Sequence, residues 1–198
     1  MSETAIFDTA QMLRTHIGQV LGGVNDIHIG APLRSEVGQA RVSIFPFHFQ
    51  VNKELRNEQR FRAPPLLEPP SSRRQPIDSL PLDIKFLITV FRIPDASSPS
   101  PNELTTLGLI VQRLQAQPNL VGENMNGQVV RLSPEPYPME ELSRIWGLFG
   151  QDVYRSSMVY LASPVMVEAG NLAAGVPVQE HTQNAGIDPN PPQLAGAG

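Results

Sequence analysis

The sequence predicts an α+β fold, in which one compact domain (residues 1–169) is followed by a flexible tail (residues 170–198). Three segments repeat apolar residues every three or four positions, as helices packed by one face do. Several others alternate apolar and polar residues or are almost continuously apolar, as strands are. We therefore expect a mixed, mostly antiparallel sheet with about three helices packed on it.

The helical segments carry recognisable start and stop signals. The first covers residues 6–21 and ends at Gly22, because glycine accepts the left-handed conformation that follows a helix. The second begins near Asn102, a good N-cap residue, and stops before Pro118. The third opens at Pro138 and continues into a stripe that includes the only tryptophan. These three elements should cover the sheet.

The strand segments differ in how deeply they should lie in the sheet. Residues 82–90 and 154–167 are apolar enough to be interior strands. Residues 45–51 alternate and should present one apolar face, but Val42 and Ile44 are in the other phase, and Pro46 lies next to this slip. A bulge or an edge position would explain both facts. Shorter strands are expected within 24–29 and 127–132.

The tail and one long loop lack a core pattern. Residues 170–198 are mostly Ala, Gly, Pro, Gln and Asn, and such a segment cannot bury enough apolar surface to offset the entropy of ordering it. Residues 61–80 contain two Pro-Pro pairs and are expected to form a long exposed loop. Loops of this length are usually functional or disordered.

The sequence offers no enzyme or cofactor signature. It has no cysteine, so disulfides and thiolate metal sites are excluded. It lacks the glycine-rich phosphate motifs and the nucleophile elbow. None of the histidines is paired with another at a spacing typical of metal ligands: His16, His28, His48 and His181. We predict a protein that is not an enzyme and needs no cofactor.

Charge and hydropathy exclude two further classes of partner. The net charge of −4 argues against a dedicated nucleic-acid binder. No apolar run approaches the ~18 residues of a membrane span, and the N-terminus has no secretory signal. We therefore expect a cytoplasmic protein that neither binds nucleic acid nor inserts directly into a membrane.

Basic residues gather in the segment that begins after residue 51. Three interpretations are open: a solvated face, a protein–protein interface that uses the planar, weakly hydrated guanidinium, and a phosphate site, which the interleaved acids disfavour. The interface interpretation names these candidates, together with the neighbouring asparagine: Asn52, Arg56, Arg60, Arg62, Arg73 and Arg74.

A string of short motifs, in order along residues 5–168, resembles a known family. It consists of Phe49–Asn57, Arg62–Pro65, Leu82–Phe91, Leu107–Gly108, Leu142–Trp146 and Tyr154–Leu161. The order is similar to that in the cap, or tail-terminator, family of contractile injection systems, phage-tail-like particles such as antifeeding prophages and Photorhabdus virulence cassettes. The chain departs from the family pattern in having Phe86 where a hydroxyl-bearing aromatic is more usual, and in its low-complexity tail.

The resemblance implies a structural function. A protein of this family would form a homohexameric ring on the distal end of the particle, bind the last layer of inner tube and sheath, end their polymerisation and stabilise the extended sheath. The alternative is a non-enzymatic adaptor that links the particle to cargo, a membrane or another partner.

Overall fold

The structure of the chain is a computed structural model. It describes residues 4–58, 60–61, 76–77, 79–91, 102–122, 128–150 and 154–168. The predicted flexible tail and most of the predicted long loop therefore lie outside the described residues. Together, the described residues form one α+β domain.

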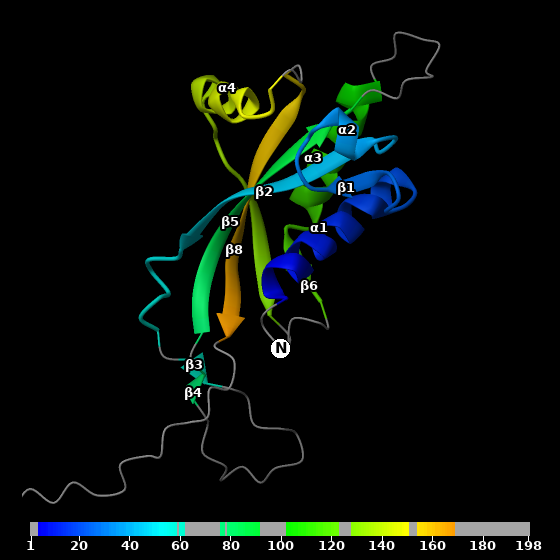
Figure 1. Ribbon diagram of the computed structural model, residues 1–198. Coiled ribbons are helices and arrows are strands. Elements are labelled where there is room, and N and C mark those ends of the chain that lie inside the picture. The colour runs from blue at the N-terminus through cyan, green and yellow to red at the C-terminus, as the bar shows by residue number, and fades with distance from the viewer. Residues whose placement is uncertain are drawn as a thin grey trace, which may run out of the picture.

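A six-stranded sheet forms the centre of the domain (Figure 1). Only the β1–β2 pair is parallel, and the four remaining pairs are antiparallel. A separate two-stranded ladder, β3 (Arg60–Phe61) with β4 (Pro76–Ile77), lies at the ends of the predicted loop. In spatial order the strands of the main sheet are β1 (Ile27–Ile29), β2 (Val42–Val51), β5 (Ser79–Val90), β8 (Ser157–Glu168), β7 (Val129–Pro134) and β6 (Asn119–Val121).

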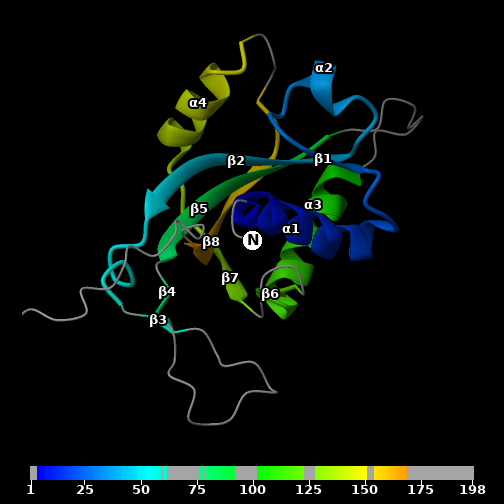
Figure 2. The same cartoon turned by 60° about the horizontal axis from the view of Figure 1, so that its bottom comes forward.

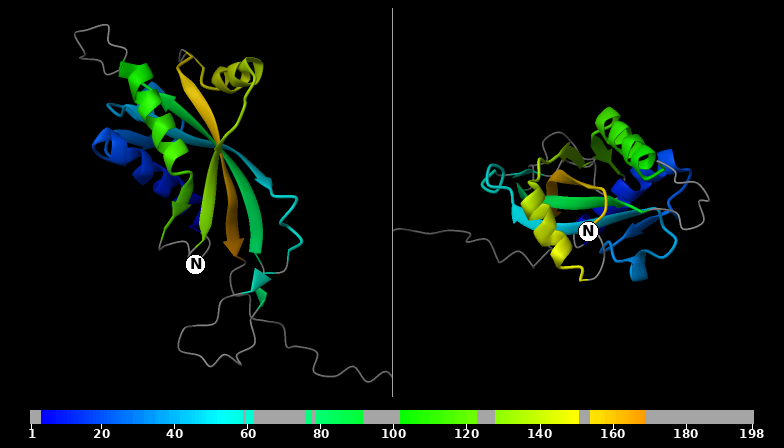
Figure 3. Two further views of the ribbon diagram at one scale, coloured as in Figure 1. Left: turned by 180° about the vertical axis from the view of Figure 1, so that it is seen from behind. Right: turned by 90° about the horizontal axis from the view of Figure 1, so that it is seen from above.

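Helices cover the two faces of the sheet unequally (Figure 3). The long helices α1 (Ala5–Leu21) and α3 (Asn102–Ala116) pack on one face, which we call the α1 face. The shorter α4 (Met139–Gly147) packs on the opposite face, the α4 face. A four-residue helix, α2 (Arg34–Val37), lies in the connection between β1 and β2. The predicted fold class is confirmed.

Two apolar clusters correspond to the two faces. The larger one joins α1 and α3 to the inner strands and includes Leu13, Ile17, Phe86 and Ile110, all fully buried. The smaller one centres on Leu87 and the aromatic residues around α4. Strands β5 and β8 are interior, as predicted, and their side chains contribute to both clusters.

Strand β2 contains a bulge, one of the two explanations offered for the slip in its pattern, and this bulge changes the face that its side chains occupy. The pairing with β5 shifts between Pro46 and His48, so Phe47 is the extra residue. Opposite residues of an antiparallel pair share a face. Phe45 lies opposite Leu87 on the α4 face, whereas Phe49 lies opposite an isoleucine of the α1 cluster. The expectation of one apolar face over residues 45–51 was therefore wrong.

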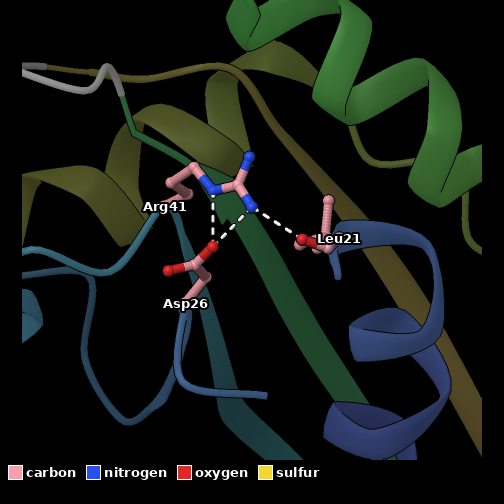
Figure 4. A network of polar contacts seen from close by, with 3 residues as sticks. All are labelled: Leu21, Asp26 and Arg41. Atoms are coloured by element: carbon pink, nitrogen blue, oxygen red, sulfur yellow. Dashed lines mark hydrogen bonds and ion pairs between the residues drawn. The ribbon is translucent and has the colours of Figure 1, made fainter. Parts of the chain in front are cut away.

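An arginine clamp ties the end of α1 to the sheet (Figure 4). Gly22 ends the helix in the left-handed conformation, with φ of +82°, as predicted. The guanidinium of Arg41 donates to the backbone carbonyl of Leu21 at 2.8 Å and to the carboxylate of Asp26 through both Nε and a terminal nitrogen. A cation at the C-terminal carbonyls also complements the helix dipole.

Smaller elements differ from the sequence-based expectations. Strand β6 and helix α2 were not predicted, because each has only three or four residues and too few positions to establish a period. The helix stripes predicted from the sequence also begin later than the helices do, since the apolar side chains of Leu104 and Met139 are exposed at the first turns of α3 and α4.

Candidate protein-interaction surface

Asn52 builds a turn at the end of β2. Its side-chain oxygen accepts hydrogen bonds from the backbone N–H groups of Glu54, at 3.1 Å, and Leu55, at 3.0 Å. Its backbone carbonyl accepts from the N–H of Arg56 at 3.1 Å. An asparagine that bonds to the backbone two and three residues ahead is a standard turn former. The segment that carries the sequence resemblance is therefore a defined turn.

The same side chain anchors the turn to two strands. The Asn52 amide nitrogen donates to the carboxylate of Asp83 at 2.9 Å and lies 3.3 Å from the hydroxyl of Ser163. That hydroxyl donates to the same carboxylate oxygen of Asp83 at 2.5 Å. β2, β5 and β8 thus meet in one partly buried polar network. Asn52 positions the loop that comes after it, and its assignment as a contact residue stays a prediction.

The predicted arginines are only partly placed. Arg56 is exposed in the turn that Asn52 begins, where its guanidinium can reach a partner. Arg60 belongs to β3, whose backbone alone is described. Arg62, Arg73 and Arg74 lie outside the described residues. Their predicted grouping into one interface is therefore untested.

Apolar side chains surround the base of this turn, a feature that the charge pattern did not indicate. Phe49 is 46% exposed and Val51 40%, although both point to the α1 face, and Leu80 of β5 is 46% exposed. Figure 2 shows β2 curving away from β1 and the helices toward this end. An exposed apolar group on an edge strand marks a contact surface more often than a scattered single residue does.

A groove lies at the other side of the sheet, between α1, the end of α3 and β6. Its volume is about 520 Å³, and its lining includes Met12, His16, Arg113 and Leu120. His16 lies on α1, where its Nε2 is buried and has no hydrogen-bond partner within the described structure. Burial lowers the pKa of His16 below its usual 6.5, the nearby charge of Arg113 lowers it further, and a hydrogen bond with the Gln117 backbone opposes both.

Two kinds of feature are missing from the described residues: a cluster of metal ligands and a helix of membrane-spanning length and hydropathy. No group of three or more His, Asp or Glu side chains among them is arranged to hold a metal ion. None of the helices within the described ranges is long and apolar enough to cross a membrane. The features that remain are the turn at Asn52, the exposed apolar end of β2 and the groove beside β6.

Comparisons with known proteins support the fold and identify the family. One solved structure, the sheath/tube terminator of the PVC extracellular contractile injection system in its extended state, matches 100% of this chain at 18% identity, with a TM-score of 0.58. Another, the tube-terminating cap of the anti-feeding prophage, matches 89% at 17% identity, with a TM-score of 0.52. The chain spans 66% and 59% of the lengths of these two proteins.

The comparisons by sequence identify the family of the chain directly. No curated protein matches it in sequence. The family model of the Pvc16 N-terminal domain matches residues 9–180, which is most of the chain. This confirms the resemblance that the motifs along residues 5–168 indicated: the chain belongs to the Pvc16 N-terminal domain family.

Proposed function

We propose that this chain is a structural terminator, a non-enzymatic protein that forms a homohexameric ring on the distal end of a contractile injection system. The observation that carries the proposal is the family match over residues 9–180. The two solved structures that share the fold are themselves a sheath/tube terminator and a tube-terminating cap. On this proposal the protein is made in the cytoplasm and incorporated into the particle.

The mechanism is occupation of an interface. Tube and sheath layers present the same surface to each new layer, and a heterologous contact of this kind does not stop by itself. A ring whose lower face matches the last layer and whose upper face does not would end polymerisation. Contacts at the capped end would also hold the extended sheath. No bond chemistry and no nucleotide is required.

Deletion of the gene tests this role. We expect particles of irregular or excessive length, or sheaths that contract early, and a separate gene copy should restore uniform extended particles. Electron microscopy of purified particles measures both. If the deletion strain makes particles of normal length whose cargo or attachment alone is changed, the protein is an adaptor and not a terminator.

The basic segment after residue 51 is proposed to contact either the adjacent subunit or the last tube and sheath layer. Asn52 holds the start of this segment in place, and the guanidinium groups of Arg56, Arg60, Arg62, Arg73 and Arg74 would meet that partner. Reversing Arg73 and Arg74 to glutamate should weaken docking without unfolding the domain, because both are expected from the sequence to lie in an exposed loop, where charges contribute little to stability.

The matched control for this double reversal is Arg144→Glu. Arg144 is an exposed arginine on α4 that pairs with Glu140 one helical turn away. Copurification with particles and thermal melting separate the two effects. If the double reversal lowers the melting temperature sharply and leaves docking intact, these arginines are structural.

A further inference from the structure

The two edges of the main sheet are both open in the described chain. β1 covers only Val42–Ile44 of β2, and the last hydrogen bond on that side runs from the Gly30 N–H to the Ile44 carbonyl. Beyond Ile44, no described strand pairs with the outer edge of β2. At the opposite side of the sheet, β6 pairs with β7 alone. Unpaired edges are ready templates for another strand.

The free backbone groups at the β2 edge can be assigned. The Asn52 N–H donates to the Pro81 carbonyl at 2.9 Å, and these two residues are opposite each other in the register of β2 and β5. Hydrogen-bonded and non-bonded pairs alternate along an antiparallel ladder. Gln50 therefore points its backbone groups at β5, whereas Phe49 and Val51 point theirs away from the sheet. Their side chains are the exposed apolar ones.

The β6 edge has the matching pattern. The Leu132 N–H donates to the Pro118 carbonyl at 2.7 Å, so Leu120 also points its backbone groups at β7. Asn119 and Val121 then point theirs outward, two residues apart, as Phe49 and Val51 do. The groove of about 520 Å³ lies along this strand on the α1 face.

From these two edges we infer that the end of β2 of one copy adds as a strand to β6 of the next copy. The contact is head-to-tail, so each copy uses both of its edges, and repeated rotation can close a ring. This deepens the proposed function, because it names the contact between subunits of the proposed ring. Phe49 and Val51 of the incoming strand would enter the groove above Met12 and Leu120.

The topology determines the direction of this pairing. Four antiparallel steps separate β2 from β6, so the two strands run in the same direction. A sheet continued around a ring by one repeated rotation keeps its strand direction and its faces. β2 therefore adds parallel to β6, with Phe49 or Val51 opposite Leu120. Phe49, Val51 and Leu120 all belong to the α1 face, so the faces agree.

Disulfide trapping tests the contact, because the chain has no cysteine of its own. Gln50, Asn119 and Val121 are exposed, and their side chains point to the opposite, α4 face. If Val51 lies opposite Leu120, Gln50 meets Asn119. If Phe49 lies opposite Leu120 instead, Gln50 meets Val121. Oxidised at high concentration, one of the double variants Gln50→Cys/Asn119→Cys and Gln50→Cys/Val121→Cys should form a ladder of covalent oligomers that extends beyond the dimer.

Controls distinguish this contact from random collision. Gln50→Cys/Ser143→Cys, whose second site is exposed on α4, should give no ladder. Adding Val51→Pro to the productive double variant should abolish the ladder with little change in melting temperature, since that N–H has no partner within the described sheet. Gln50→Pro in the wild-type chain should lower the melting temperature, since it removes a ladder hydrogen bond.

Any one of three results would overturn the edge contact. The first is that neither double variant forms species above the dimer, and the second is that the Gln50→Cys/Ser143→Cys control forms the same ladder. The third is a ladder that still forms after Val51→Pro is added. The native mass of the wild-type protein separates this failure from failure of the proposed function. Rings of six subunits without the cross-link would leave the terminator role standing and remove the edge contact. If the covalent ladder forms but deletion of the gene leaves particle length normal, the edge contact stands and the terminator role fails.

Discussion

At the scale of single residues, the charge cluster and the turn that begins it have different roles. The sequence indicated Asn52 and the arginines together, because the arginines cluster in the segment after residue 51 and Asn52 lies next to them. The structure gives Asn52 four hydrogen bonds from its side chain, two within the turn and two to Asp83 and Ser163. A side chain used so fully has little capacity left for a partner. Arg56 is exposed and retains that capacity.

Replacing Asn52 by alanine should lower the free energy of unfolding by about 1–3 kcal/mol, because it removes one of the two donors to the partly buried Asp83 carboxylate and the side-chain acceptor of the turn. Denaturant unfolding measures the change. Asn57→Ala, at an exposed position in the same turn, should change stability far less. Unchanged stability with impaired docking would instead make Asn52 a contact residue, as the sequence analysis predicted.

His16 should make stability depend on pH. Its pKa is lower in the folded state than the usual 6.5, chiefly through burial and then through Arg113, so the unfolded chain binds more protons in the window below 6.5. Stability should therefore be full above that value and fall as the pH drops through 6.5 toward the folded-state pKa.

The His16→Gln variant should lose less stability than the wild type as the pH is lowered from above 6.5 to below it, measured by thermal melting in matched buffers. Other groups that titrate in this window act on both proteins and cancel in the difference. An NMR titration that finds the pKa of His16 above 6.5 would contradict the assignment.

At the scale of elements, the helices and long strands could be predicted from the sequence. Strand β6 and the groove beside it could not, for physical reasons. Helical periodicity identified α1 and α3, and long apolar segments identified β5 and β8, because each element has enough residues to show its pattern. Three-residue β6 carries no period, although it forms a sheet edge and borders the groove. The groove could not be predicted either, since its lining combines α1 with the end of α3 and β6, which come much later in the sequence.

Helix α4 offers a test of packing on the less covered face. Trp146 is only 4% exposed and makes edge-to-face contacts with Phe149 and Tyr154. Trp146→Ala should lower the free energy of unfolding by about 3–5 kcal/mol, the usual cost of removing a buried aromatic side chain. Leu148→Ala, next to the same helix but 82% exposed, should change it by less than about 0.5 kcal/mol. Equal effects of the two variants would show that α4 is not held by its aromatic face.

At the scale of the whole molecule, the domain and the tail should separate in behaviour. The described domain has its own core, whereas residues 170–198 are predicted from composition to stay flexible. Limited proteolysis should trim the chain from about residue 170 and leave a resistant fragment. A truncated chain of residues 1–169 should melt at the same temperature as the full chain. A tail that resists proteolysis in the isolated protein would contradict the predicted boundary.

The bulge in β2 also has a consequence for how this gene can change. Phe47 is the one residue of this strand without a partner in β5, so its loss would leave a regular ladder in which Pro46 lies opposite Phe86 and His48 opposite Lys85, as they do now. Deletion of that single codon would therefore keep Phe49 and Val51 on the face to which they now point. Deletion of one codon between Phe49 and Val51 would instead turn the residues after it to the other face. In descendant genes, a one-codon deletion in this strand should therefore be found at the bulge and not in the outer half.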